Sequence, residues 1–312
     1  MARHNIILGQ DKAVRNASSA PQFGQSSQQS AYAQPDSRTQ WSSGFGQQGG
    51  QAPHAPQFGG GQQEDLEAIY ARPSATGHDT GRMTMRDALN AITATLGVIV
   101  VIGFVIAVTP AMLSSVGGSA GAQTGLLIAG GATAIGAIGG LVLGLVNAFK
   151  REPSAILVLL YAVAEGLLLG GISGTMEYRF PGIALQAVVG TLAVAVTVLV
   201  LFRAGILRTS PTLTKIFAVA MIAYLLFGLV NIGYLLFTGQ SLRDGLMGLV
   251  IGGLAVCMAS YSLVMDFEDV QRAANAGVAR KYAWRCAFGL AATLVWLYIE
   301  ILRILAILRG ND

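Results

Sequence analysis

Three acidic side chains lie inside or at the end of long apolar stretches, where a charge is costly and is usually kept for function. Glu165 lies near the middle of one stretch, and Glu300 lies inside the last one. Asp266 directly follows an apolar run, and the uncharged Asn231 is a weaker fourth case. Because burial disfavours the charged form of a carboxyl, such groups can respond to pH near neutrality.

Each of these groups also has a purely structural interpretation. Arg303 follows Glu300 by three residues, so on a helix the two charges could neutralise each other. Asp266 could lie at the membrane surface with access to water. Glu165 has no sequence-local partner and could stay protonated and hydrogen-bonded.

A further charged group follows Asp266. Glu268 and Asp269 precede Arg272 by four and three residues, as is typical of charges at the end of a helix. Asp269 is nevertheless kept as a candidate ion-path or modulating residue, together with Glu165 and Arg303.

Enzyme chemistry has no recognisable basis in the sequence. The three histidines, His4, His54 and His78, all lie in the polar N-terminal part, and no zinc-protease, nucleophile-elbow or Walker motif occurs. Cys257 and Cys286 lie in or beside apolar runs and are expected to be free thiols. We therefore expect no enzyme activity, no cofactor and no nucleic-acid partner.

The elements that must position these residues are membrane-spanning helices. The chain is 53% hydrophobic and only 12% charged, whereas soluble domains carry roughly 25% charged residues. Since a span needs about 20 apolar residues, the sequence predicts an all-α integral membrane protein in contact with the lipid bilayer. The seven expected spans are 89–113, 124–148, 155–174, 183–201, 216–237, 245–265 and 286–308.

The N-terminal part differs in composition. Residues 1–85 are rich in Gln, Gly, Ser and Pro, and such a composition cannot bury enough apolar surface to offset the entropy of ordering. We expect a disordered tail over 1–85 and a transmembrane domain over 86–312.

Basic residues predict the orientation, because Lys and Arg favour cytoplasmic loops. Eleven of them lie beside the first span or in alternate loops, and three lie on the other side of the spans. The protein is expected in the cell membrane, with its N-terminus in the cytoplasm and its C-terminus on the opposite side.

Glycines at every fourth position predict close helix packing in lipid. They occur in the second, third and sixth expected spans: Gly136, Gly140 and Gly144; Gly166, Gly170 and Gly174; Gly248 and Gly252.

Three motifs carry a resemblance to a known family. They are Glu165-Gly-Leu-Leu-Leu-Gly170, Met265-Asp266-Phe267 and Leu297-Tyr-Ile-Glu300-Ile-Leu302. With seven spans in this order, the region from about 85 to 309 resembles the Bax inhibitor-1 (transmembrane Bax inhibitor motif) family, which includes bacterial YccA-like proteins. The first eighty-odd residues lie outside the resemblance.

The resemblance implies a central seventh helix and a pH-sensitive calcium leak. In the family, two carboxyls on the sixth and seventh spans share a proton and gate the pore. Carried over, the proton-sensing and gating pair is Asp266 and Glu300. Two close carboxyls cannot both ionise cheaply, so such a pair titrates as a unit.

This sequence departs from the family pattern at several positions. Glu300 stands where the family has Asp, Arg303 adds a nearby cation, and the second span lacks the arginine proposed to latch the gate. A simple hairpin centred near Gly277 would place Asp266 opposite Phe288, with Glu300 about 18 Å further along the helix. Pairing would require residues 273–284 to shift the turn.

Two functions therefore stay open. The first is a pH-sensitive ion leak, with calcium as the ion implied by the resemblance. The second is a non-conducting interaction protein that modulates membrane proteases or stress responses, with the tail presenting binding segments. Buried carboxyls without local partners favour the first, whereas the missing arginine and the presence of Arg303 favour the second.

Overall fold

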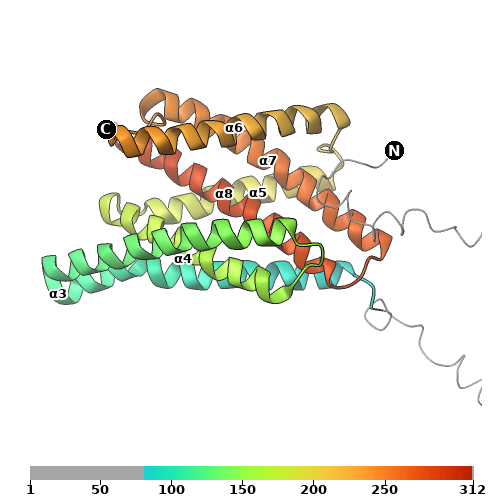
Figure 1. The fold of residues 1–312 in the computed structure, drawn as a ribbon, viewed down its shortest axis with the longest axis horizontal. Coiled ribbons are helices and arrows are strands. Elements are labelled where there is room, and N and C mark those ends of the chain that lie inside the picture. The colour runs from blue at the N-terminus through green and yellow to red at the C-terminus, as the bar shows by residue number, and fades with distance from the viewer. Residues whose placement is uncertain (1–80, 311–312) are drawn as a thin grey trace, which may run out of the picture. The chain divides into compact units, whose positions relative to one another are not determined.

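The computed structural model describes residues 81–310 (Figure 1). All regular elements in this range are helices: α3 (Met85–Phe149), α4 (Ala155–Arg179), α5 (Ile183–Arg203), α6 (Pro211–Thr238), α7 (Gly245–Ala276) and α8 (Tyr282–Gly310). Each is long and apolar enough to cross a membrane, which gives six candidate span helices within the described range. The prediction of an all-helical membrane protein is confirmed at this level. The predicted tail falls almost wholly outside the described residues.

Helix α3 contains two of the expected spans in one element. Its 65 residues would extend roughly 100 Å if straight, about three times the hydrocarbon thickness of a bilayer. The backbone leaves helical geometry at Gly118, where φ is 58° and ψ is −136°. A Cβ atom on Gly125 would come within 2.5 Å of the Cα atom of Pro110, so the two arms fold back on each other tightly.

Both arms of α3 lie against α4. A Cβ on Gly136 in the second arm would come within 2.3 Å of the Leu168 backbone nitrogen, and one on Gly166 would meet Ile102 of the first arm at 2.7 Å. Only the absence of side chains allows this approach, as small residues do in membrane helices. The predicted glycine packing is therefore present between α3 and α4.

Helix α8 is the central element of the bundle. It packs against α3, α4, α5 and α7, and it crosses the bundle among them (Figure 1). Each of the four buried apolar clusters in the described range includes α8 residues, among them Ala287, Ala291, Leu297 and Leu302. The expected central position of the last helix is thus observed.

Helix α6 is peripheral. It contains no buried residue, and the only described helix whose backbone comes close to it is α7, at a few positions. Its contacts with the rest of the protein depend on a few side chains, and two of its polar residues belong to the candidate site described below.

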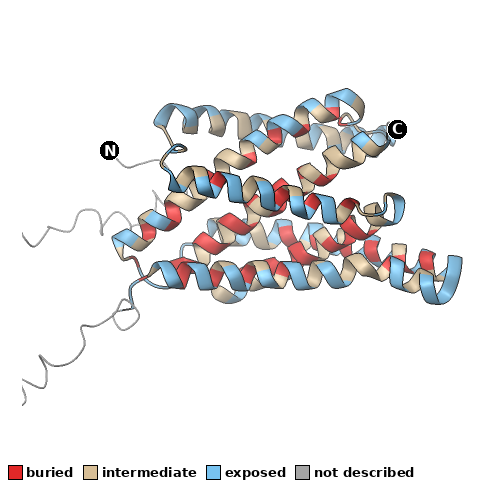
Figure 2. Ribbon diagram, turned by 180° about the vertical axis from the view of Figure 1, so that it is seen from behind, coloured by how far each residue is buried: buried red, intermediate tan, exposed pale blue. Residues whose placement is uncertain are grey.

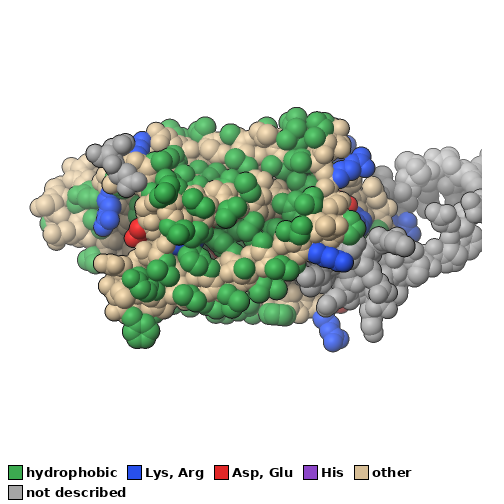
Figure 3. Space-filling view, turned by 90° about the horizontal axis from the view of Figure 1, so that it is seen from above, with side chains coloured by type: hydrophobic (Ala, Val, Ile, Leu, Met, Phe, Trp, Pro, Cys, Tyr) green, Lys and Arg blue, Asp and Glu red, His purple; other side chains and the backbone are tan. Residues whose placement is uncertain are grey.

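The surface of the bundle is apolar in the way lipid contact requires. Large exposed side chains include Val116, Leu127, Leu236 and Phe237. Buried residues lie on the inner faces of the helices, and exposed residues lie on the outer faces (Figure 2). Hydrophobic side chains cover the middle of the molecule, while Lys and Arg gather towards its two ends (Figure 3). This distribution matches a protein that crosses a bilayer.

The first described residues are anchored to the α7–α8 connection. Arg82 and Ala279 form an antiparallel bridge, and the Met83 backbone N–H donates to the Val278 carbonyl at 2.6 Å. Thr84 and Asp87 then form a capping box that begins α3. The chain therefore enters the bundle at the same end as the turn between α7 and α8.

Candidate functional site

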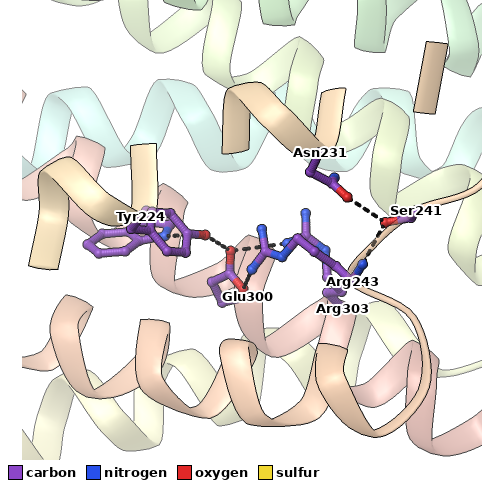
Figure 4. Close-up of polar contacts among 7 residues, drawn as sticks. Tyr224, Asn231, Ser241, Arg243, Glu300 and Arg303 are labelled. Atoms are coloured by element: carbon purple, nitrogen blue, oxygen red, sulfur yellow. Dashed lines mark hydrogen bonds and ion pairs between the residues drawn. The ribbon is translucent and has the colours of Figure 1, made fainter. Parts of the chain in front are cut away.

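Glu300 lies at the centre of a buried polar cluster. Its side chain extends from α8, and the residue is 1% exposed. Arg243 Nη2 lies 2.7 Å from Oε2, while the Tyr224 hydroxyl donates to Oε1 at 2.5 Å. Arg303 Nη1 lies 3.3 Å from Oε1. Figure 4 shows the carboxylate between Tyr224 and the two arginines. Two cations thus face one carboxylate, a balance that a buried charge requires.

The connection between α6 and α7 positions Arg243. Asn231 of α6 accepts hydrogen bonds from the Leu242 backbone N–H at 2.8 Å and from the Ser241 hydroxyl at 3.2 Å. The Arg243 backbone N–H donates to Ser241 Oγ at 3.1 Å. Asn231 was the weakest of the polar candidates in the sequence, and its role here is to fix the loop that carries Arg243.

Tyr224 joins α6 to this cluster. Its ring centroid lies 5.4 Å from that of Trp296 on α8, and the Trp296 indole N–H donates to its hydroxyl at 3.4 Å. The guanidinium carbon of Arg243 lies 5.3 Å from the centre of the Tyr224 ring, within the range of a cation–π contact. The cluster therefore links α6, the α6–α7 connection and α8.

Asp266 has a different set of partners. The Thr293 hydroxyl of α8 donates to Asp266 Oδ2 at 2.6 Å, and the hydroxyls of Thr293 and Ser262 lie 3.1 Å apart. A Cβ atom on Gly289 would come within 3.3 Å of Asp266 Oδ1. Asp266 therefore faces the segment 289–293 of α8.

The structure does not bring Asp266 and Glu300 together. Thr293, the partner of Asp266, precedes Glu300 by seven residues on α8, which is about 10 Å along the helix axis. Glu300 instead faces Gly252, whose Cβ would lie 3.9 Å from Oε2. The two carboxyls are therefore not in contact, contrary to the expectation from the family resemblance. The connection 277–281 between α7 and α8 is short, so no extra loop shifts the hairpin register.

The charges beyond Asp266 form local ion pairs. Arg272 lies 3.0 Å from both Glu268 Oε1 and Asp269 Oδ1, as their spacing predicts. The Thr209 hydroxyl, from the α5–α6 connection, donates to Glu268. Asp269 is therefore held on its own helix, and its predicted part in an ion path stays a prediction.

Glu165 lies buried between α3 and α4. It is 7% exposed, and a Cβ on Gly140 would come within 2.8 Å of its Oε1. Its Oε2 has no hydrogen-bond partner among the described residues. Tyr161 is its hydrogen-bonding neighbour on the same helix, and Glu165 forms no ion pair with another described residue.

Two residues of the cluster were missed in the sequence, namely Tyr224 and Arg243. A signal for Arg243 existed, since it is the one basic residue of the connection between α6 and α7. A tyrosine in an apolar helix gives no comparable signal. No group of three or more His, Cys, Asp or Glu side chains that could hold a metal ion occurs in residues 81–310.

Comparison with known proteins gives one match. The family described as Bax inhibitor 1 like matches residues 15–310. The match begins well inside the N-terminal part, which corrects the expectation that the first eighty-odd residues lie outside the resemblance. No match was found among curated proteins or among solved structures.

Proposed function

The chain belongs to the Bax inhibitor 1 like family of multi-pass membrane proteins, and from this premise we propose that it is a non-enzymatic, pH-responsive ion leak. Calcium is the ion that the resemblance suggests. The proton-sensing and gating groups in this proposal are Asp266 and Glu300. Glu165, Asp269 and Arg303 are further ion-path or modulating residues.

One observation carries the proposal: ionisable groups occupy the interior of the bundle at separate levels along α8. Glu300 of α8 faces Gly252 of α7, and Asp266 of α7 faces Thr293 of α8. Acidic groups kept inside a membrane protein mark ion pathways and proton relays more often than structural contacts. Their position at the contact between α7 and the central helix α8 supports a path along α8.

The cluster around Glu300 supports a closed state that depends on charge. Arg243 and Arg303 compensate an ionised Glu300. Protonation of Glu300 would remove the negative partner and leave Arg243, which is 7% exposed, as a buried cation. Because an unpaired buried charge is costly, acidification would favour release of Arg243 and separation of α6 from α8.

The described conformation gives Asp266 and Glu300 separate partners. We therefore propose that they respond to pH as two groups, with Thr293 serving Asp266 and Arg243 serving Glu300. A shared proton would require another conformation, in which the two carboxyls are in contact.

We also propose seven crossings, with the two arms of α3 counted separately. The basic loops would place the N-terminus in the cytoplasm. The cluster around Glu300 would then lie towards the opposite side, and the charges around Asp269 would lie towards the cytoplasm.

The experiment is calcium flux into liposomes that contain the purified full-length protein, measured with an enclosed indicator between pH 5 and 8. The proposal expects a leak that changes with pH, and Glu300→Gln should raise it at neutral pH by loosening Arg243. Glu152→Gln is the matched control, because Glu152 is an exposed carboxylate at the surface. Flux no greater than in empty liposomes at every pH would refute the proposal.

The second candidate is a non-conducting interaction protein that modulates membrane proteases or stress responses. The pairing of Glu300 with two arginines favours it, because a carboxylate compensated in this way can serve stability alone. In that case, the flux experiment would show no leak, and a membrane protease would copurify with the protein from its native membrane.

A further inference from the structure

A pocket lies at the end of the bundle where α8 finishes. It has a volume of about 360 Å³ and is formed by the end of α4, the α6–α7 connection and the end of α8. The charged residues that line it are Arg179, Arg243, Arg303 and Asp244. Three cations therefore face one anion around a single cavity.

The positive charge of the three arginines that line the pocket exceeds the negative charge of the carboxylates around them. Glu300 forms ion pairs with both Arg243 and Arg303. Arg179 makes no hydrogen bond or ion pair with another described residue, although it lines the same pocket. Asp244 and Glu300 supply two negative charges against the three arginines, so one positive charge remains and the pocket favours an anion.

A second observation comes from Arg243 itself. Its side chain is 8% exposed, and its Nε atom has no hydrogen-bond partner among the described residues. A guanidinium has five N–H donors in a planar fork, which suits the oxygen atoms of a phosphate. Arg243 thus combines a buried charge with unused donor capacity beside the cavity.

The remaining lining suits a lipid. Met176, Phe180 and Ile307 contribute apolar surface to the pocket, next to the arginines. A planar guanidinium pairs well with phosphate oxygens, and an anionic lipid presents such a phosphate beside its apolar chains. The combination of cationic and apolar surface matches a phosphodiester with its acyl chains attached.

We propose that this pocket binds a phosphate anion through Arg179, Arg243 and Arg303. The phosphate belongs either to an anionic lipid headgroup or to a free phosphate ion, and the experiment below separates these sources. The proposal does not depend on ion flux, because binding is measured directly.

The test uses purified full-length protein in a neutral detergent. Short-chain phosphatidylglycerol, phosphatidylcholine with the same chains, and inorganic phosphate are titrated at equal ionic strength. Binding is followed by native mass spectrometry and by the melting temperature. We expect phosphatidylglycerol to bind more tightly than phosphatidylcholine. Binding of inorganic phosphate alone, with no preference between the lipids, would identify the free ion as the source.

Two variants give the proposal its sharpest test. Arg179→Gln should weaken binding about fivefold, as expected for the loss of one cation near a headgroup, and it breaks no contact within the described bundle. Arg203→Gln is the matched control, an exposed arginine at the end of α5, and should leave binding unchanged. Asp244→Asn should tighten binding, because Asp244 is the single acidic residue in the lining.

The proposal fails if phosphatidylglycerol binds no more tightly than phosphatidylcholine and inorganic phosphate does not bind. It also fails if Arg179→Gln and Arg203→Gln weaken binding equally, or if Asp244→Asn leaves it unchanged. Asp244→Asn removes no arginine, so it tests the proposal even if Arg179→Gln lowers the stability of the protein.

Discussion

At the scale of the residue, the main feature is a buried carboxylate, Glu300, whose shortest contacts come from outside its own helix. Arg303, three residues away, was a visible candidate, but its contact with Glu300 is the longer one at 3.3 Å. Arg243 makes the shorter contact, at 2.7 Å, from a loop 57 positions earlier. A buried ion pair of this kind can add little to net stability, whereas the removal of one partner is strongly destabilising.

The pair can be tested by a double-mutant cycle. Arg243→Leu should lower the free energy of unfolding by about 3 kcal/mol, because it removes one partner of a buried ion pair, and Glu300→Leu should cost a similar amount. The double variant should cost clearly less than the sum, since both changes act on one contact. Unfolding in mixed detergent micelles measures all three.

The control for this cycle is Arg203→Leu, which removes an exposed cation and should change stability by no more than about 0.5 kcal/mol. Strictly additive costs for Arg243→Leu and Glu300→Leu would show that the two side chains do not interact.

A second residue-scale prediction separates two gating mechanisms. Asp266 contacts Thr293, which lies about 10 Å from Glu300 along α8. Asp266→Asn and Glu300→Gln should therefore each remove part of the pH response of flux. Their effects should add in the double variant, as expected for independent sites.

A shared proton makes the opposite prediction for the same three variants. Each single change would then abolish the pH response, and the double variant would behave like either single one. Liposome flux across the pH range decides between these patterns, with Glu152→Gln again as the control.

At the scale of the element, glycine spacing determines which helices can approach closely. The two arms of α3 meet α4 where neither helix has side chains in the way. Gly136 and Gly130 lie in the same arm, but a Cβ on Gly130 would meet nothing within 4 Å. One face of the arm thus packs against protein, and the other is free.

This contrast gives a matched pair of variants. Gly136→Ala should destabilise the protein by about 1–3 kcal/mol, because the added carbon would lie 2.3 Å from the Leu168 backbone nitrogen. Gly130→Ala should be neutral or slightly stabilising, since alanine favours the helix. The melting temperature in detergent measures both, and equal effects would contradict the packing of α3 against α4.

At the scale of the whole molecule, the bundle is organised around α8 and covered by apolar surface. Charged side chains gather towards its two ends. The residues 81–84 pair with 278–280 at one end, while the cluster around Arg243 lies near the start of α7, at the other end of that helix. The molecule therefore has two chemically different ends.

The topology prediction follows from this arrangement. A fluorescent protein that matures only in the cytoplasm should be bright when fused at the N-terminus and dark when fused after Asp312, because seven crossings place the ends on opposite sides. A reporter that requires export, inserted at Gly118, should be active between the two arms of α3. Cytoplasmic fluorescence at both ends would contradict seven crossings.

The sequence by itself determined the helical membrane class, the approximate spans, the closely packed glycine faces and the identity of the costly acidic residues. These are local properties, since apolar length, glycine spacing and a charge in an apolar run can be read from neighbouring residues. The pairing of Asp266 with Glu300 was implied by the family resemblance, whereas a simple turn near Gly277 already placed the two carboxyls at different levels along the helices.

Only the tertiary structure decided which groups meet. Contact between Glu300 and Arg243 depends on how α6, its following loop and α8 are placed, and no local pattern encodes that placement. The same holds for Tyr224 and for the pocket shared by Arg179, Arg243 and Arg303, which come from three separate parts of the chain. The partner of a buried charge depends on how distant parts of the chain pack together. An unpaired buried charge strongly destabilises the folded protein, so only an arrangement that supplies a partner is stable.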